Sequence, residues 1–560
     1  MSNLFDESSL AMIPTAYKDG KLYSVRPTDG SGDFTFIRGS NLSATRVNAS
    51  QLIEKGSENV LLQSNQFDTT WGNNNTTETS GQADKDGGTD AWLINSTSSF
   101  GSVIQGISSV SGVFTLSVYA KAGTNNWMLL RMLGSSNSRA WFDLENGVLG
   151  STDGPTIESK IESVGGGWYR CSVTGNMTSF SQVLLYPTNA NLVVGAVGNI
   201  YIQDSQVELG LAASPYIETT TTTAQAGVLE NTPRFDYSGG ATCPSLLLEP
   251  SRTNQCTQSE YIGSIDWNQS GITRSLVITQ TSETNPEGAS ICWKIQGTAS
   301  DNQLANNSST NSGTTITNSI YVKRVSGTGN VFLRDVNNTH TSFSLSVADG
   351  WKRIDVTGTA TSATARFYLN LQVPTDEILI WGAQQEIGTY PTSYIPTYGV
   401  SQTRAGDDMT TDFSSSLATN GSATIFFHDL GVADVNSISS AAGLYRYEGS
   451  SGNYVSLTTD ITNWRIRIQS GGSSNFQGLS GYAKTDPIKL AIVVTSTTYS
   501  IYANGSAVFE NESLTATADF SSIDRFQSGI QEVSGVRKAL QHLVFPMALS
   551  DVECIALTTI

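Results

Sequence analysis

The chain has 560 residues, a formal net charge of −18, and only 14% Asp, Glu, Lys and Arg. This length exceeds one hydrophobic core and predicts about three to five domains. Excess negative charge disfavours nucleic acid and anionic lipid as partners, because both present phosphates. A charged fraction well below the usual ~25%, with abundant Gly, Ser, Thr and Asn, favours many short strands joined by polar turns.

Neither a disulfide framework nor a membrane span is expected. The five cysteines are scattered, form no C-x-x-C pair and are expected as small buried residues: Cys171, Cys243, Cys256, Cys292 and Cys554. No stretch approaches the ~20 apolar residues that cross a bilayer, so we expect no membrane insertion. The start, MSNLFDESSLAMIP, lacks the basic and apolar regions of a secretory signal. We therefore expect synthesis in the cytoplasm.

Residues 1–57 are predicted to form a small N-terminal module. Short strands are expected at Lys21–Arg26 and Phe34–Arg38, on either side of the Gly-containing turn at residues 29–33. Large apolar residues are too few here for an independent core. We expect this module to pack on a partner subunit or a larger assembly.

An internal duplication organises the middle of the chain. IYIQDSQVELG from Ile200 corresponds to ILIWGAQQEIG from Ile378, SVYAK from Ser117 to SIYVK from Ser319, and GWYRCSVTG from Gly167 to GWKRIDVTG from Gly350. The marks recur in the same order, which predicts two copies of one domain. We place the first repeat at residues 58–222 and the second at residues 253–404. Alternation of apolar and polar residues from Phe114 to Lys121 predicts a strand with one face on a core.

Two further segments complete the chain. Residues 223–252 are a connector with one apolar strand, Leu246–Leu248. Residues 405–560 form a third pattern, with a buried strand at Ile488–Val494 and a hairpin turn at Asn504-Gly505. Ser550 and Glu553 predict a capping box at the start of a short C-terminal helix. The fold class is therefore all-β, with tandem antiparallel β-sandwich domains.

Four motifs resemble segments of tailed-bacteriophage fibre and tail or head appendage proteins. They are RGSNLSATRVN from Arg38, CPSLLLEPSRTN from Cys243, WGAQQEIGTYPTSYIPT from Trp381 and the ending ALSDVECIALTTI from Ala548. The resemblance implies jelly-roll, carbohydrate-binding-like repeats followed by a concanavalin/laminin-G-like sandwich. It also implies a place on the exterior of the virion, a homotrimer, contacts with other virion proteins through residues 1–57, and attachment to host cell-surface glycans.

Catalytic and metal-binding motifs are weak. The three histidines, His340, His428 and His542, are far apart, and no G-x-S-x-G motif is present. Glu208 and Glu386 occupy matching positions at strand-end turns, where a structural hydrogen bond explains a carboxylate better than catalysis does. The run Asp84–Asp90 loosely resembles a calcium loop but lacks its bidentate Glu, so a polar turn is favoured. We expect no enzyme activity, no cofactor and no metal.

Glycan binding is the sharpest functional hypothesis. A sugar needs an aromatic plane flanked by hydrogen-bonding groups. Trp168 with Arg170 and Trp351 with Arg353 repeat one such pattern, although a Trp wedged under a loop with its Arg stacked on it explains these matched residues better. Trp127 and Trp141 have no counterpart in the other repeat and fall near expected loops, which favours ligand contact.

Together these patterns predict a structural phage virion protein, a fibre or appendage, that displays glycan-binding sandwiches. The alternative is a polysaccharide depolymerase with accessory carbohydrate-binding modules. Two carboxylates could support such a reaction, and 49 acidic residues always allow some pair.

Overall fold

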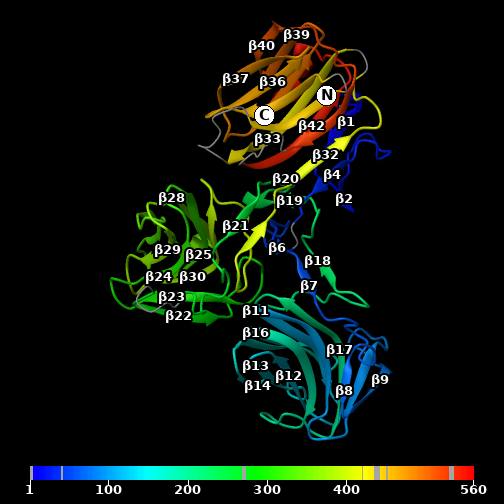
Figure 1. Ribbon diagram of the computed structural model, residues 1–560, viewed down its shortest axis with the longest axis vertical. Helices are drawn as coiled ribbons and strands as arrows, with labels where there is room; N and C mark the ends of the chain where they lie inside the picture. Colours follow the sequence, from blue (N-terminus) through cyan, green and yellow to red (C-terminus); the bar gives the residue numbers. More distant parts are fainter. Residues whose placement is uncertain are drawn as a thin grey trace.

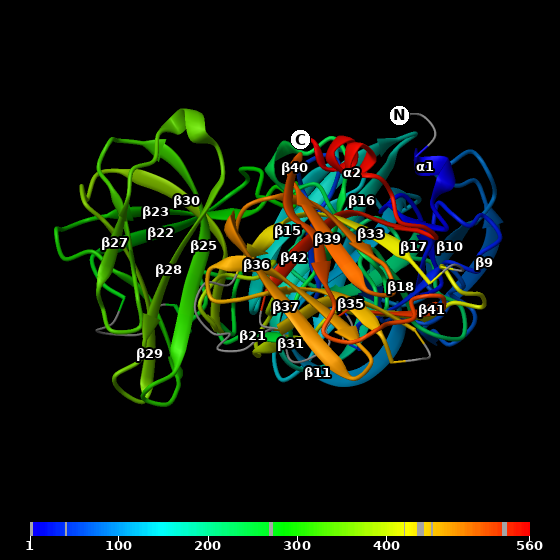
Figure 2. The same ribbon diagram turned by 90° about the horizontal axis from the view of Figure 1, so that it is seen from above.

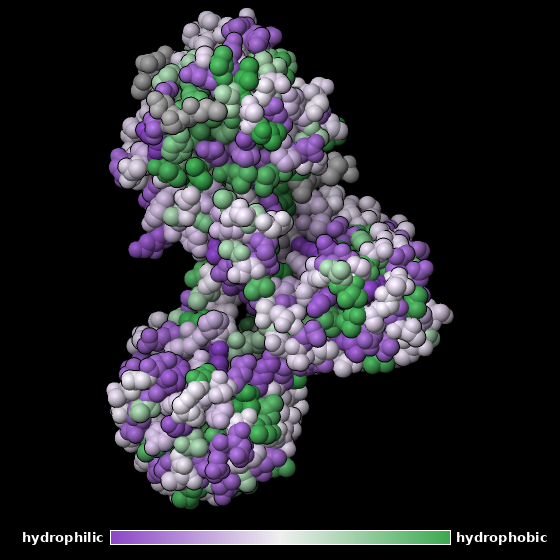
Figure 3. All heavy atoms as spheres, turned by 180° about the vertical axis from the view of Figure 1, so that it is seen from behind, coloured by the Kyte–Doolittle hydropathy of each residue, from purple (hydrophilic) through white to green (hydrophobic). Residues whose placement is uncertain are grey.

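The computed structural model describes residues 4–39, 42–267, 273–418, 421–433, 442–449, 452–528 and 535–560. Three β-rich lobes surround a narrow central region (Figure 1). Both chain termini lie in the upper lobe, the first repeat forms the lower lobe, and the second repeat projects to one side, as the view from above also shows (Figure 2). Seen from behind, hydrophilic and hydrophobic residues intermix over all three lobes (Figure 3).

The all-β prediction is confirmed. The sheets are antiparallel throughout their pairings, and helix in the described residues is confined to α1 (Leu4–Glu7), α2 (Asp551–Thr558) and the short 3₁₀ turns η1 (Ser238–Gly240) and η2 (Val347–Asp349). In the described part of the chain, no helix has the length and apolar character that crossing a membrane requires. All five cysteines are free, and four of them are buried.

The lobe of the first repeat is one sheet of ten strands that curls over its own core. Two 21-residue strands, β11 and β16, pass through both layers, and β11 bends at bulges between Gly106 and Gly112. The strands are β8 (Gly72–Asn74), β9 (Thr76–Gln82), β10 (Ala91–Ser96), β11 (Ser102–Ala122), β12 (Trp127–Leu133), β13 (Asn137–Asp143), β14 (Val148–Asp153), β15 (Thr156–Gly165), β16 (Trp168–Thr188) and β17 (Gly198–Leu209).

The expected alternation on β11 is only partly observed. Leu116 and Val118 enter the core as predicted, but Thr115 and Ser117 on the opposite face are buried as well. The Thr115 hydroxyl donates to the Gly210 carbonyl at 2.9 Å, because the segment after β17 folds back over this face. The sequence pattern could not reveal that covering segment.

The lobe of the second repeat has the same two layers, but here each layer is a separate sheet. The first contains β22 (Leu276–Thr281), β23 (Cys292–Gly297), β30 (Glu377–Ile387), β25 (Thr315–Ser326) and β28 (Lys352–Thr359). The second contains β24 (Leu304–Ser309), β29 (Thr364–Leu371), β26 (Val331–Arg334) and β27 (His340–Phe343). Breaks after β24 and β28 fall where β11 and β16 bend in the first repeat.

The C-terminal lobe packs two sheets over the largest core. The first contains β19 (Arg234–Asp236), β20 (Ser245–Leu248), β42 (Val536–Phe545), β33 (Ala423–Ala433), β38 (Ile488–Val494), β39 (Thr498–Ala503) and β40 (Ser506–Ser513), with β1 (Leu10–Met12) on β42. The second contains β2 (Tyr17–Lys18), β3 (Lys21–Leu22), β4 (Phe34–Ile37), β32 (Asp408–Asp412), β41 (Ile523–Ser528), β34 (Ala442–Gly449), β35 (Tyr454–Thr459), β36 (Asn463–Ser470) and β37 (Ser473–Ala483).

Local predictions for this lobe agree with the structure. Strand β38 has the predicted bounds, and Asn504 and Gly505 turn between β39 and β40 with φ of 46° and 81°. Both hydrogen bonds of the capping box between Ser550 and Glu553 are present at the start of α2.

The N-terminal module and the connector differ from expectation, because both supply strands to the C-terminal lobe. Strand β1 pairs with β42, and β4 pairs with β32. From the connector, β20 also pairs with β42. The apolar residues of this module therefore find their core within the same chain, against the connector and the C-terminal lobe.

Three short ribbons join the lobes: β5 (Thr45–Val47) with β6 (Ile53–Lys55), β7 (Ser57–Asn59) with β18 (Ala224–Ala226), and β21 (Arg252–Asn254) with β31 (Gln402–Arg404). We call these ribbons, together with the buried charges of Arg38, Arg234, Glu249 and Asp407, the hub.

A buried acid in the C-terminal lobe makes stability depend on pH. Burial raises the pKa of Asp429 to about 7, and its carboxyl accepts hydrogen bonds from Tyr445 Oη at 2.9 Å and Gly431 N at 3.0 Å. Burial, reinforced by Arg537, lowers the pKa of His542 to about 3. The folded lobe therefore holds a proton on Asp429 that the unfolded chain releases near pH 4.

We expect Asp429→Asn to gain stability relative to wild type as pH rises. The stabilisation from the raised pKa is present below about pH 4 and is lost as pH increases to about 7. The free energy of unfolding should be measured for both proteins at several pH values. Between about pH 4 and pH 7, the value for the variant minus the value for wild type should rise by up to ~1.4 kcal/mol per pH unit. His542→Gln should instead gain stability relative to wild type as pH falls below the ordinary pKa of histidine, because the folded lobe keeps His542 neutral. A difference independent of pH would contradict the assignment.

Candidate functional site

The two repeats place their matched residues in the same register. Tyr119 on β11 lies opposite Arg170 on β16 and Gln203 on β17. Tyr321 on β25 lies opposite Arg353 on β28 and Trp381 on β30. The pairing of β11 with β17 shifts register just before Tyr119, and the pairing of β25 with β30 shifts just before Tyr321. At these points Asp204 on β17 and Gly382 on β30 adopt positive φ. Identical registers are what a duplication predicts.

The matched carboxylates are structural. Glu208 Oε1 accepts a hydrogen bond from Ser214 N at 2.8 Å, and Glu386 Oε1 accepts one from Thr392 N at 2.6 Å. Both side chains are buried. They tie the chain that leaves the last strand back to the sheet, so neither faces a substrate cleft.

Other matched polar residues also make equivalent bonds. Ser64 Oγ lies 2.6 Å from Tyr216 Oη, as Ser259 Oγ does from Tyr394 Oη. The indoles behave alike: Trp92 Nε1 donates to the Asn65 carbonyl and Trp293 Nε1 to the Glu260 carbonyl. These pairs align the two lobes residue by residue.

The predicted Trp–Arg platforms are not open Trp faces. Trp168 is 2% exposed, and Trp351 is half-buried with its Nε1 donating to the Thr284 carbonyl at 3.0 Å. Arg170 lies over the Tyr119 ring and Arg353 over the Tyr321 ring, each at 5.5 Å. The arginines therefore stack on the neighbouring strand's tyrosine and not on the tryptophan two residues away.

The unmatched tryptophans lie together on the outer face of the first-repeat lobe. Trp141 is 2% exposed, and its Nε1 donates to the Val193 carbonyl at 2.7 Å. Trp127 is half-buried in the same apolar cluster. Arg139 lies over Trp141 and forms an ion pair with Asp153 at 2.7 Å. Of these two candidates, only Trp127 keeps an appreciable surface for a ligand.

The calcium-like run forms a polar turn. The Asp84 carboxylate accepts hydrogen bonds from Asp86 N, Gly88 N and Asp90 N, at 2.8, 2.7 and 3.1 Å. These backbone donors occupy the oxygens that a cation would need. Among the residues that the structure describes, no group of three or more acidic, His or Cys side chains is arranged for a metal ion.

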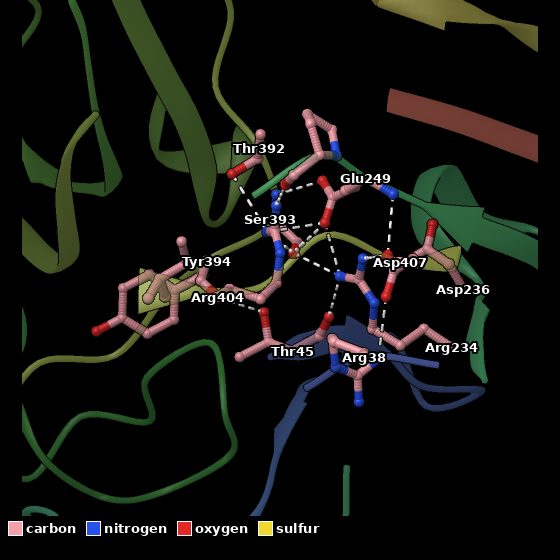
Figure 4. Close-up of polar contacts among 12 residues, drawn as sticks. Arg38, Thr45, Arg234, Asp236, Glu249, Thr392, Ser393, Tyr394, Arg404 and Asp407 are labelled. Atoms are coloured by element: carbon pink, nitrogen blue, oxygen red, sulfur yellow. Dashed lines mark hydrogen bonds and ion pairs between the residues drawn. The ribbon is translucent and has the colours of Figure 1, made fainter. Parts of the chain in front are cut away.

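The hub contains a fully buried ionic network (Figure 4). Arg234 Nη1 contacts Glu249 Oε2 at 2.6 Å, and Arg234 also pairs with Asp407. Arg38 reaches Asp407 at 3.2 Å, and Arg404 reaches Glu249 at 2.9 Å. All five side chains are at most 1% exposed.

Backbone groups of the second repeat and of strand β5 extend this network. Glu249 Oε1 accepts from Ser393 N at 2.7 Å, and Arg234 donates to the Thr45 carbonyl at 3.1 Å. Burial alone would raise the pKa of Glu249, but Arg404 and Arg234 outweigh it and hold the pKa far below its usual range. The carboxylate is therefore charged and fixed in place.

Three of the four motifs singled out in the sequence meet in the hub, those that begin at Arg38, Cys243 and Trp381. Arg38 and Thr45 come from the first motif, Glu249 from the second, and Thr392 and Ser393 from the third. Ser40 and Asn41 of the first motif lie outside the described residues. The sequence alone did not indicate that these motifs form one ionic cluster, because Arg38, Glu249 and Ser393 lie far apart in the chain.

A second charged cluster lies where the two repeats meet. The Lys55 ammonium contacts Glu287 Oε1 at 2.7 Å and Glu260 Oε1 at 3.3 Å, and also bonds Tyr398. Tyr398 Oη donates to Glu260 at 2.8 Å. Burial, followed by the Glu260 carboxylate, raises the pKa of Glu287 well above its usual range.

A cavity of about 350 Å³ lies at one end of the first-repeat lobe. Its lining includes the amides of Gln63 and Gln66, the carboxylates of Asp90 and Glu218, and Trp92. No sequence motif unites these residues, because they come from three separate segments of the chain.

No protein family and no curated protein matches the chain. Solved structures that align with part of it include the Ruminococcus gnavus sialidase CBM40 bound to α2,3-sialyllactose, at 18% identity over 25% of this chain and 84% of that one, with a TM-score of 0.21. A point mutant of the NanB sialidase from Streptococcus pneumoniae aligns at 19% identity over 27% and 26%, with a TM-score of 0.22. The Botulinum neurotoxin serotype D binding domain aligns at 12% identity over 27% and 39%, with a TM-score of 0.23. With such low TM-scores, these likenesses carry no argument about function.

Proposed function

We propose that this protein is a structural bacteriophage virion component, a fibre or appendage, whose β-sandwich lobes bind host-surface glycans. The observation that carries the glycan proposal is the cavity of the first-repeat lobe, which is lined by amides, carboxylates and part of Trp92. Hydroxyl groups of a sugar need such hydrogen-bonding partners beside an apolar surface. The virion location is supported by the phage-like motifs.

The arrangement of the lobes suits display. The first-repeat lobe lies opposite the lobe that holds both termini (Figure 1). Buried ion pairs and ribbons hold the lobes through the hub, so a particle attached at the C-terminal lobe would present the first repeat outward. A homotrimer would add avidity by holding several weak sites together, and light scattering on the full chain should give three times the mass of one chain.

The depolymerase alternative needs two carboxylates facing a cleft. The paired acids Glu260 and Glu287 are capped by Lys55, and Glu208 and Glu386 bond the backbone. Asp90 and Glu218 do line the cavity of the first repeat, but both are exposed to water, unlike the general acid of a glycosidase, which lies in an apolar pocket. We therefore propose binding without glycan cleavage.

We expect fluorescently labelled full-length protein to bind host cells and to release no oligosaccharide from their polysaccharide. Binding is measured by flow cytometry with competition by soluble host polysaccharide, and cleavage by reducing-end release. Immunogold labelling of purified particles tests the virion location. Absence of binding would refute glycan attachment, steady oligosaccharide release would favour the depolymerase, and unlabelled particles would refute the virion assignment.

A further inference from the structure

The duplication offers an internal comparison for the cavity of the first repeat. The equivalent bonds of Trp92 and Trp293 align Asn65 with Glu260 and place Asp90 at the position of Ile291. The equivalent bonds of Ser64 N to Thr219 and Ser259 N to Thr397 likewise place Thr220 at the position of Tyr398. The corresponding end of each lobe can thus be compared residue by residue.

In the second repeat this end is covered by the chain itself. Val113 and Leu211 of the first repeat pack against Ile291 and Tyr398, and Val113 N donates to the Tyr398 carbonyl at 3.1 Å. In the first repeat, Asp90 and Thr220 replace the apolar pair and are exposed. Polar side chains in the first repeat thus occupy the positions of the buried Ile291 and Tyr398. This end of the first-repeat lobe therefore faces water and polar solutes rather than another lobe.

At the covered end of the second repeat, a positive charge lies between two carboxylates. There the chain inserts the Lys55 ammonium between Glu260 and Glu287. The open cavity of the first repeat has two carboxylates at other positions, Asp90 and Glu218, and its lining contains no Lys, Arg or His. An anionic ligand would meet two like charges with no cation to offset them.

We propose that this cavity binds a saccharide ring without negative charge, either neutral or amine-bearing. The inference rests on the proposed glycan-binding function and assigns its site and ligand class. The amides of Gln63 and Gln66 would meet sugar hydroxyls, and the carboxylates would accept from hydroxyl or ammonium groups. The Trp92 indole is 7% exposed and is held by its bond to the Asn65 carbonyl, so it gives the cavity a small, fixed apolar surface.

Titration calorimetry on the full chain tests this with glucosamine, N-acetylglucosamine and N-acetylneuraminic acid. The first two should bind, and the acidic sugar should bind at least tenfold more weakly. Glu218→Lys places a cation in the cavity on an exposed residue and should weaken glucosamine binding at least tenfold. Glu162→Lys makes the same charge change on exposed β15, outside the cavity lining, and should alter binding less than twofold.

The outcomes separate this inference from the proposed function. Preference for the acidic sugar, or binding that survives Glu218→Lys but is lost in Trp127→Ala, would overturn the cavity assignment and retain glycan binding. If none of the sugars binds and host cells are not bound either, both fail. If host cells are bound but none of the three sugars is, only the ligand class assigned here is overturned.

Discussion

Replacing Arg234 by methionine should destabilise the protein by about 3–5 kcal/mol. The guanidinium pairs with Glu249 and Asp407 inside the hub, and all three side chains are at most 1% exposed. Methionine fills a similar volume but leaves both carboxylates short of a partner in a buried site. Denaturant unfolding followed by tryptophan fluorescence measures the loss. Limited proteolysis should also cut the connector at residues 223–252 faster.

Arg525→Met is the matched control. Arg525 pairs with Asp412 at 2.7 Å in the C-terminal lobe, but these side chains are 49% and 79% exposed. Exposed pairs contribute about 0–1 kcal/mol, so this variant should unfold close to wild type. Equal effects of the two substitutions would show that the hub network does not hold the lobes together.

Removing residues 1–57 should unfold the C-terminal lobe. Leu10, Met12, Leu22, Phe34 and Phe36 are at most 1% exposed and belong to its core. Burial of each such side chain contributes about 1.5–3 kcal/mol, so their combined loss is roughly 10 kcal/mol, comparable with the whole stability of a domain. The truncated chain should lose the cooperative transition of this lobe in calorimetry while the first-repeat lobe keeps its own.

A pair of point variants on β4 tests the same packing without truncation. Phe34→Ala should cost about 3–5 kcal/mol, because it opens a cavity beside Phe413 and Phe526. Ile37→Ala lies three residues along the strand on the solvent face, where Ile37 is 48% exposed, and should cost far less. A truncated chain that unfolds like the full protein would instead restore a separate N-terminal module.

Much of the fold could be predicted from local patterns. Period-two alternation, the Asn504-Gly505 turn and the Ser550–Glu553 capping box depend on residues close in sequence, and the turn and the capping box are observed as expected. The duplication was visible because Tyr119 and Tyr321 keep the same neighbours, so their strands pair in the same register. The structural role of Glu208 and Glu386 followed from their matched positions at strand ends.

The candidate site was less predictable. Residue type alone makes Trp141 and Trp168 candidates for ligand contact. Whether a large aromatic side chain is buried depends on segments distant in the chain, such as the one that holds Trp141 through Val193. The cavity beside Trp92 was missed for the same reason, since Gln63, Asp90 and Glu218 have no shared sequence context.

The sequence by itself thus determined the strands, the turns and the repeated registers, because hydrogen-bond geometry and side-chain alternation act over a few residues. Only the tertiary structure decided where residues 1–57 belong, that Arg38, Glu249 and Asp407 form one buried network, and which repeat leaves its end open. Those outcomes depend on burying charge and apolar surface between segments hundreds of residues apart, which no local pattern records.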